Sequence, residues 1–297
     1  MRVNPNFTPD ILTNLFQSQA QEDRALQEVS TGRRVNKPSD DPAAAAALIQ
    51  NEALASRTDQ YTQNTTSVQG LLQTADSTLS SVVTALNRAI TLGVQGANGT
   101  LSAADQQQIA VEVQGIQDQV VQLANTSYHG SYIFAGTANN APPFVVNPAA
   151  PSGVSYNGNT SVNSVQVADG LTISVNVPGS QLFQAAGSDI MGSLQQLTTA
   201  LQAGNSANVG TATTQIKSAL DYLSGQRVFY GNALSQLQSN QTFLQQEKVN
   251  ILSDQNNLVG IDLAQAATDL SQAQTIHQAG LAAVAKTIST TLLDFLK

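Results

Sequence analysis

Cysteine is absent from the 297 residues of the chain, and charged residues are scarce at 11%. Without cysteine the chain can form neither a disulfide nor a thiolate metal site, and it has no cysteine nucleophile. Ordinary domains carry about 25% charged residues, whereas here Gln, Asn, Ser and Thr fill many positions where Lys and Glu are usual. The surface is therefore polar but carries few charges.

Basic residues are the scarcer of the two kinds of charge. Twelve Lys and Arg stand against twenty Asp and Glu, which gives a net charge of -8, and none of the twelve lies between Arg88 and Lys217. Binding to nucleic acid needs a basic face, and binding to an anionic membrane surface needs a basic cluster. We therefore expect neither nucleic acid nor a membrane as a partner.

Long apolar runs are missing as well. No stretch approaches the roughly 18 apolar residues that a membrane span needs. The first ten residues lack the apolar core of a cleavable signal peptide. We predict that, if the protein leaves the cell, it does so without a cleaved signal peptide.

Apolar residues recur at helical spacing through much of the first 125 residues. A helix is predicted to begin at Pro42, because Asp41 can accept hydrogen bonds from its free amides and proline is tolerated at the first position. Glycines at positions 93, 96 and 99 are expected to end it, and a second helix follows Ser102, which has capping-box spacing to Asp105. The first helix carries a heptad seam, typical of helices packed along their length, at Val68, Leu72, Ala75, Leu79, Val82, Leu86 and Ala89.

The C-terminal half repeats this pattern. A short helix is predicted from Ile190 to a stop at Gly204, and a long helix carries a seam from Ile216 to Leu258. The seam slips by one residue at positions 259–261, and a final seam then runs to the C-terminus. The sequence therefore predicts a mainly α protein, an elongated helical rod with coiled-coil helices at its ends.

The helical period disappears between Gly130 and Gly187. Residues 171–177 alternate with period two, and short apolar runs occupy residues 132–134, 144–146 and 162–167, separated by Pro and Asn-Gly turn signals. We predict a small β-rich domain inserted into the helical rod. Because insertions at such points are usually tolerated, we expect this region to be dispensable for folding of the rod.

Candidate catalytic groups are few and isolated. His129 lies at a helix-to-strand junction, where a turn residue is expected, and His277 lies in the last seam beside Gln274, where polar residues usually fix helix register. Asp40 and Asp41 are expected to cap the helix that follows them. We therefore predict no enzyme activity, no catalytic residue, no metal and no cofactor.

The two ends of the chain are amphipathic and have no domain of their own to pack on. Segments of this kind can stay unfolded until a partner covers them. Alternatively, residues 5–30 pack on residues 263–295 within one chain, and composition alone leaves both possibilities open. The basic run at residues 33–37, offset by Asp40 and Asp41, is expected to form a contact between subunits or a helix cap.

Three stretches resemble the flagellin family and, within it, the proteins of the hook–filament junction. The first, residues 30–45, reads STGRRVNKPSDDPAAA, and its KPSDDP form is closer to the junction proteins than to filament flagellin. The second reads DLAQAATDLSQAQ at residues 262–274, with the ending LLDFL at 292–296. The third reads GSYIFAGT at residues 130–137, followed by PPF. The resemblance therefore touches both ends and the middle of the chain.

The resemblance implies a structural protein of the bacterial flagellum that lies outside the cell and is exported by the flagellar type III pathway. It implies a ring of identical subunits between the other hook–filament junction protein and flagellin, and an export chaperone on the C-terminal helix. Residues 1–48 with 256–297 would form an inner coiled-coil tube, residues 49–130 with 189–255 a helical rod, and residues 131–188 an outer β-rich domain.

Two alternatives remain beside this interpretation. One is filament flagellin, which shares the fold and has similar helical segments at its two ends. The other is an enzyme with a site in the middle region, for which the sequence holds no cluster of acid, base and nucleophile. We expect the assembly interface to combine the apolar residues of both ends with the polar residues of the 33–41 segment. Its members are Phe7, Ile11, Leu15, Arg33, Arg34, Asn36, Lys37, Asp40, Asp41, Leu263, Leu270, Leu281, Val284, Ile288, Leu292 and Phe295.

Overall fold

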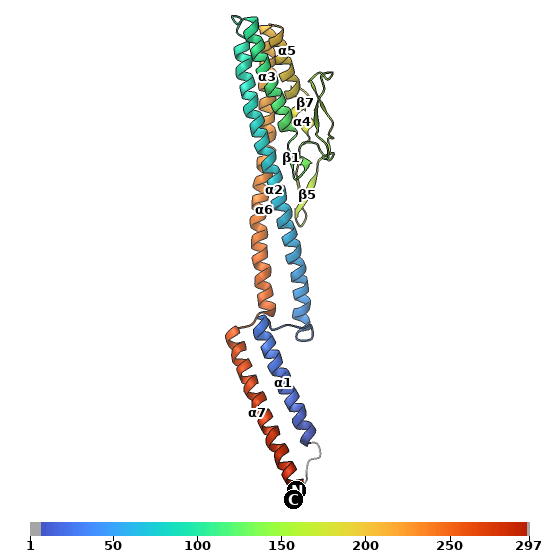
Figure 1. The fold of residues 1–297 in the computed structure, drawn as a ribbon, viewed down its shortest axis with the longest axis vertical. Helices are drawn as coiled ribbons and strands as arrows, with labels where there is room; N and C mark the ends of the chain where they lie inside the picture. Colours follow the sequence, from blue (N-terminus) through green and yellow to red (C-terminus); the bar gives the residue numbers. More distant parts are fainter. Residues whose placement is uncertain (1–6, 296–297) are drawn as a thin grey trace. The chain divides into compact units, whose positions relative to one another are not determined.

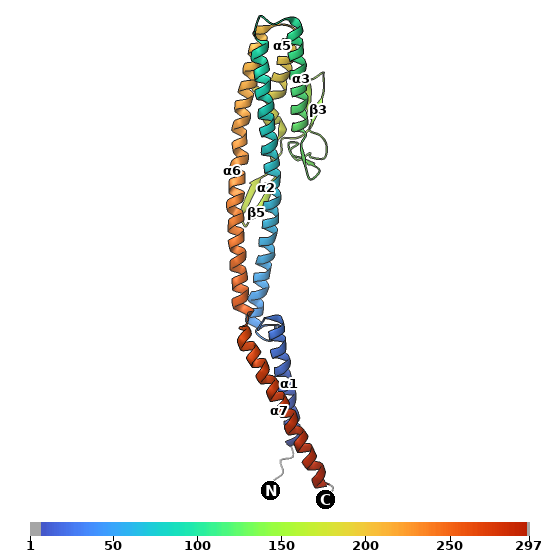
Figure 2. The same ribbon diagram turned by 60° about the vertical axis from the view of Figure 1, so that its left-hand side comes forward.

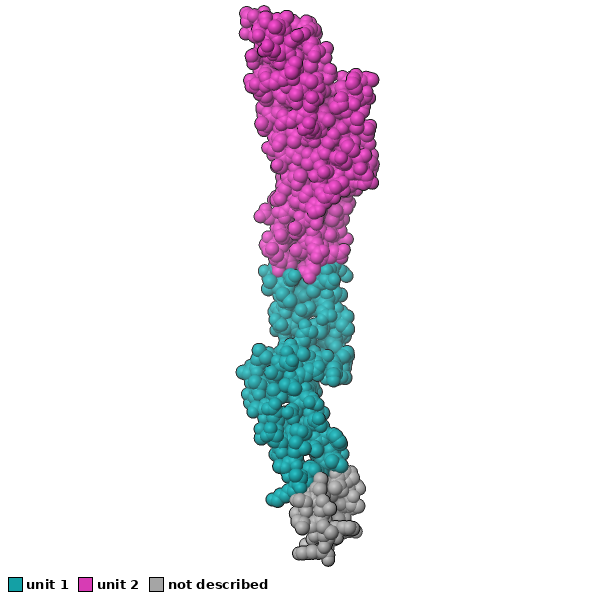
Figure 3. All heavy atoms as spheres, in the orientation of Figure 1, with its two compact units in different colours: residues 1–57, 246–297 teal, residues 58–245 magenta. Residues whose placement is uncertain are grey.

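The computed structural model describes residues 7–295, with side chains described from residue 10 to residue 286. This part of the chain contains seven helices and eight short strands (Figure 1). It divides into two compact units, one formed by residues 1–57 with 246–297 and the other by residues 58–245 (Figure 3). The mainly α fold class predicted from the sequence is confirmed.

The first unit brings the two ends of the chain together. Helix α1 (Phe7–Thr31) lies antiparallel to helix α7 (Leu263–Phe295) (Figures 1 and 2). The unit also holds the beginning of α2 (Pro42–Gly96) and the end of α6 (Ser206–Val259). The structure thus adopts the intramolecular pairing of the ends that the sequence left open.

The predicted helix boundaries in this unit are confirmed. The Ala44 amide donates to Asp41 Oδ1 over 3.0 Å, so Asp41 caps α2 at the expected position. The predicted slip of the seam falls between α6 and α7, where Asp262 Oδ1 accepts from the Ala264 amide over 2.9 Å. A helix break, rather than a bend, therefore separates the two C-terminal seams.

The second unit is a bundle of α2, α3 (Ala103–Ala124), α5 (Ile190–Gln202) and α6 (Figure 1). The predicted heptad residues of α2 form its core, since Leu72, Leu79 and Leu86 are fully buried. The predicted capping box of α3 is present, because Ser102 Oγ accepts from the Asp105 amide and Asp105 accepts from the Ser102 amide. Apolar periodicity and capping chemistry therefore define this bundle.

Two glycines of α2 have a different purpose from the one expected. Gly93 lies within the helix, which ends at Gly96. A Cβ atom at Gly93 would collide with the Thr213 side chain of α6, and one at Gly96 with the Leu201 side chain of α5. Both glycines let neighbouring helices approach closely, and only Gly96 lies at the end of the helix.

The middle region forms four separate two-stranded antiparallel hairpins in the described part of the chain. The predicted strands at 144–146, 162–167 and 171–177 are largely present, whereas only the first residue of the predicted 132–134 strand is extended. A short helix, α4 (Gly179–Phe183), precedes the last hairpin. The hairpins pair β1 (Ser127–Tyr128) with β2 (Ser131–Tyr132), β3 (Phe144–Val146) with β4 (Val154–Tyr156), β5 (Ser164–Ala168) with β6 (Leu171–Ser174), and β7 (Gln184–Ala185) with β8 (Ser188–Asp189).

These hairpins share the core of the helical bundle. Phe134, Phe144 and Phe183 are buried in the same apolar cluster as the seams of α2, α3 and α6. Phe183 makes edge-on contacts with both other rings, at centroid distances of 5.4 and 5.3 Å. Asn240 of α6 donates to the carbonyl of Val167 over 2.8 Å. The structure therefore argues against the expectation that the region is dispensable for folding.

We predict that Phe183→Ala destabilises the second unit by about 3–5 kcal/mol, because it removes a ring held by two others and leaves a cavity. The measurement is denaturant unfolding of the full chain, followed by signals from residues 58–245. Val162→Ala is the matched control, since that side chain is 52% exposed. Equal unfolding midpoints for the two variants would show that the hairpin region folds apart from the bundle.

Candidate assembly surface

Arg34 joins the two connections of the first unit, the 32–41 segment and the break between α6 and α7. Its backbone amide donates to the carbonyl of Val259 over 2.7 Å. Its Nη2 donates to Asp41 Oδ2 and to the carbonyl of Leu258, both over 3.1 Å. Arg33 and Gly260 form an antiparallel backbone bridge beside it. One arginine thus holds the start of α2 against the end of α6.

The remaining polar residues of this segment fold it onto itself. Asp40 Oδ2 accepts from the amides of Asn36 and Lys37, over 3.1 and 2.9 Å. The Asn36 side chain donates to the carbonyl of Arg33 over 2.8 Å. Beneath the segment, Val35 is buried against Val259 of α6. The structure therefore uses most of these predicted interface residues within one chain, and a role between chains stays a prediction.

Both carboxylates of the segment are electrostatically stabilised in their charged form. The amides of Lys37 and Asn36 lower the pKa of Asp40 below 3.8. The Ala44 amide, followed by the Arg34 guanidinium, lowers the pKa of Asp41 below 3.8. Both groups face solvent, so they shape the loop more than they stabilise the whole fold.

Helices α1 and α7 face each other along a regular antiparallel seam. Leu15 lies opposite Gly280, and a Cβ atom at Gly280 would meet Leu15 Cδ1 at an ordinary contact distance of 3.6 Å. Ser18 lies opposite His277, with 3.1 Å between Ser18 Oγ and His277 Nδ1. The buried or half-buried positions step by four and three along both helices. They are Ile11, Leu15, Ser18, Glu22, Ala25 and Val29 on α1, and Ala266, Leu270, Ala273, His277, Gly280 and Val284 on α7, and Glu28 of α1 is half-buried beside them.

The seam combines large apolar residues such as Leu15 and Leu270 with small residues such as Ala273 and Gly280. A cavity of about 440 Å³ is lined by Ile11, Leu15, Gly280, Ala283 and Val284. Apart from Ala266, the described seam residues are only half-buried, so the two helices bury only part of their apolar surface against each other. The pair therefore has apolar surface left to cover.

Several large apolar side chains of the pair point away from the seam. Phe16 of α1 is 67% exposed and Leu263 of α7 is 60% exposed. Exposed apolar residues gathered on one element mark a surface for association. The outward residues are Leu12, Phe16 and Leu26 on α1, and Leu263, Ile276 and Leu281 on α7.

The predicted interface residues of the two ends divide between these surfaces. Ile11, Leu15, Leu270 and Val284 lie in the seam, whereas the predicted Leu263 and Leu281 face outward. The sequence analysis missed the outward residues Leu12, Phe16, Leu26 and Ile276, although the i, i+4 spacing of Leu12 and Phe16 is a signal that could have found them. The side chains of Phe7, Ile288, Leu292 and Phe295 lie outside the described residues.

The described part of the chain offers no centre for metal chemistry, since it contains no cluster of three His, Cys, Asp or Glu side chains that could hold a metal ion. His129 occupies the turn between β1 and β2 with a φ of 50°, followed by Gly130 with a φ of 82°, so its turn conformation is as predicted. Among residues 7–295, no helix is long and apolar enough to cross a membrane.

The fold defines a class of helical protein in which the two ends of the sequence pair with each other, while the middle of the sequence forms a helical bundle with hairpins. Residues 7–139 match the family described as the bacterial flagellin N-terminal helical region, and residues 213–296 match the bacterial flagellin C-terminal helical region. Together these matches cover most of the chain. The chain belongs to the flagellin family.

The similar proteins include both hook-associated proteins and flagellins. Flagellar hook-associated protein 3 of Salmonella typhimurium is 35% identical over 175 residues, which are 59% of this chain and 54% of that protein. Flagellin of Listeria innocua is 25% identical over 95% of this chain and 93% of its own length. The crystal structure of flagellar hook-associated protein 3 from Legionella pneumophila has a TM-score of 0.64 at 16% identity, covering 72% of this chain and 98% of that one.

The matches to the hook-associated relatives are partial. The chain spans about half the length of the curated hook-associated proteins that it matches, 54% of the Salmonella protein and 42% of the Escherichia coli protein. At 16% identity, the likeness to the Legionella structure establishes the fold alone.

We predict that acid loosens the 32–48 segment through Asp40 and Asp41. Both pKa values are lowered in the folded chain, so their contribution is present above the unfolded pKa of about 3.9 and is lost as the pH falls through the folded values. The measurement is hydrogen exchange at the Asn36, Lys37 and Ala44 amides, corrected for the intrinsic pH dependence. Protection should fall below about pH 4, while the Val113 amide of α3 serves as the internal control. In Asp40→Asn, protection at Asn36 and Lys37 should already be low at neutral pH. Unchanged protection of these two amides in the variant would contradict the assignment.

Proposed function

We propose that this chain is a structural subunit of the bacterial flagellum that stands at the junction between hook and filament. The observation that carries the proposal is the similarity to flagellar hook-associated protein 3 of two bacteria, at 35% and 37% identity. The paired helical ends with outward apolar residues support it, because such a surface suits a subunit that is buried among its neighbours. Its activity is structural, and it performs no enzymatic reaction.

The partners follow from this position in the flagellum. Copies of the chain form a ring, which contacts the other hook–filament junction protein on one side and flagellin on the other. An export chaperone covers α7 before assembly, because that helix carries the outward residues Leu263, Ile276 and Leu281. The protein works outside the cell, and it is exported without a cleaved signal peptide.

The assembled subunit is arranged in three layers. Residues 1–48 with 256–297 form the inner coiled-coil tube, residues 49–130 with 189–255 the helical rod, and residues 131–188 the outer β-rich layer. The small side chains of the seam between α1 and α7 support the first assignment, since they leave large apolar residues such as Phe16 and Leu281 for contacts between subunits.

Electron microscopy of flagella that carry labelled protein tests the proposal. A label confined to a ring at the distal end of the hook is the expected result. A label along the whole filament would overturn the junction assignment in favour of filament flagellin, the alternative supported by the nearly full-length match to the Listeria protein at 25% identity.

We predict that the double change Phe16→Asp with Leu281→Asp leaves the free chain folded but abolishes assembly. Both side chains are exposed, at 67% and 47%, so the charges cost little in the free chain. In the assembly each side chain would contribute on the order of 1.5–3 kcal/mol if fully buried. The measurements are helicity of the purified chain and a motility and secretion assay, in which flagellin should be lost to the medium.

Two further variants make this test specific, a control in the hairpin region and a second change in α7. Val162→Asp places the same charge on an exposed apolar residue of the hairpin region, and it should leave assembly intact. A second double variant, Leu281→Asp with Ile288→Asp, changes α7 alone. It should also prevent assembly, which would show that α7 is needed without a change in α1. Normal filaments from the Phe16 and Leu281 double variant would rule out this surface as the assembly contact.

A further inference from the structure

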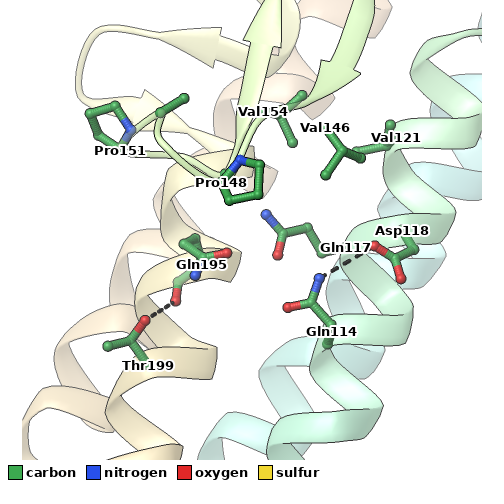
Figure 4. Close-up of a pocket in the computed structure, with 12 residues that line it drawn as sticks. Gln114, Gln117, Asp118, Val121, Val146, Pro148, Pro151, Val154, Gln195 and Thr199 are labelled. Carbon is green, nitrogen blue, oxygen red and sulfur yellow. Dashed lines mark hydrogen bonds between the residues drawn. The ribbon is translucent and has the colours of Figure 1, made fainter.

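The second unit contains a cavity that assembly through the paired ends does not use. It has a volume of about 460 Å³ and lies between α3, α5 and the connection from β3 to β4 (Figure 4). Helix α3 contributes three polar side chains to its wall, and α5 contributes two. The lining includes Gln114, Gln117, Asp118, Gln195, Pro148 and Pro151.

Gln117 carries a buried acceptor that has no partner. The residue is only 2% exposed, and its Nε2 donates to the carbonyl of Ser152 over 3.0 Å. Its Oε1 has no hydrogen-bond partner among the described residues. Turning the amide over would set Oε1 against the Ser152 carbonyl, so the hydrogen bond fixes the orientation. The arrangement therefore calls for a donor from outside the described residues.

The surrounding groups add further acceptors. Figure 4 shows the Gln117 amide pointing into the space, with Gln195 and Pro148 across from it. A Cβ atom at Gly153 would lie 3.0 Å from Gln195 Oε1 and 3.4 Å from Gln117 Nε2, so glycine keeps this space open. Asp118 is the only charged residue among those that line the cavity. Its Oδ1 accepts from Gln114 Nε2 over 3.3 Å.

The charge of the surrounding chain selects a cation. Between Arg88 and Lys217 the sequence holds no Lys or Arg but five acidic residues, and the whole cavity wall falls inside this stretch. No internal cation of the stretch can therefore neutralise Asp118. Because Asp118 carries the one charge among the lining residues, the cavity favours a cationic ligand over an anionic one.

We propose that this cavity binds a primary alkylammonium group. An ammonium has three donors and no acceptor, which suits the unpartnered Gln117 Oε1 and the Asp118 carboxylate, while the Nε2 donors of Gln117 and Gln114 are already used within the chain. The alkyl stem attached to it would lie against Pro148 and Pro151, as long cationic side chains lie along apolar surface. Such a group is supplied either by a lysine side chain of another protein or by a free diamine.

Nuclear magnetic resonance of the full chain, with glutamine side-chain amides observed, tests the proposal. The probes are Nα-acetyl-lysine methylamide and cadaverine, and the matched control is Nα-acetyl-norleucine methylamide, which has the same stem length without the charge. Shifts of the Gln117 and Gln195 amide signals with a saturable response to either amine, and none to the control, are the expected result. A stronger response to the lysine derivative assigns a protein side chain as the source, and a stronger response to cadaverine assigns a free diamine.

Three variants locate the binding. Asp118→Asn should weaken it about fivefold, the size of one exposed ion pair. Gln195→Glu adds a carboxylate of the same shape on the opposite wall, so it should tighten binding by a similar factor. Glu112→Gln removes the same charge from α3 at an exposed residue outside the cavity, where Glu112 pairs with Arg88, and should change binding little.

Several results would overturn the proposal. They are an equal response to the norleucine control, an equal loss in Asp118→Asn and Glu112→Gln, or no tightening in Gln195→Glu. Asp118 and Glu112 are exposed and Gln195 is half-buried, and the helicity of each variant is checked first. The measurement needs no flagellar assembly, so it can fail while the proposed function stands.

Discussion

Burial of one apolar stripe along each long helix is the interaction on which the second unit depends. The chain has few charges with which to build ionic networks, and the buried residues of its long helices form apolar seams. The few polar contacts across the seams mainly fix how the helices are aligned. Arg227 of α6 holds Asp76 of α2 through two hydrogen bonds of 2.9 and 3.1 Å. Asn240 donates to Thr65 and to the hairpin carbonyl of Val167. Packing supplies the stability, and these pairs supply the register.

The first unit follows the same logic with a different outcome. Its seam places small residues at the contact, such as Ala266, Ala273 and Gly280, and leaves large ones such as Phe16 outside. A pair of helices built this way approaches closely but buries little apolar surface of its own. In the second unit large residues such as Leu72, Leu79 and Tyr230 are fully buried in one core, although Val111 and Phe243 remain exposed. The exposed large apolar residues of the first unit are therefore available for association with other subunits.

The sequence predicted the features that depend on local chemistry and missed those that depend on the partner. Caps at Asp41 and Ser102 and the seam of α2 follow from spacing and side-chain type, so they were predictable. In α7 the sequence predicts a seam that includes Ala267, Gln274 and Leu281. In the structure the residues just before them, Ala266, Ala273 and Gly280, lie in the seam with α1 instead. A seam is predicted from the spacing of large apolar residues, whereas closely packed helices place small residues at their contact. The sequence of one helix does not show which of its faces packs against the partner helix. The cavity beside Gln117 joins α3, α5 and a hairpin connection, which only the tertiary fold brings together.

The Ser18–His277 pair shows how such a permissive seam still specifies one alignment. Ser18 Oγ donates its single hydrogen to the carbonyl of Leu15 over 2.9 Å, so it must accept from His277, and Nδ1 carries the hydrogen of that bond. A slip of seven residues would place His277 opposite Ile11 or Ala25, neither of which has a side-chain acceptor. The same slip would also move Leu15 away from Gly280, which it contacts across the seam. The Ser18–His277 contact therefore adds a polar constraint to a register that the packing of Leu15 also favours.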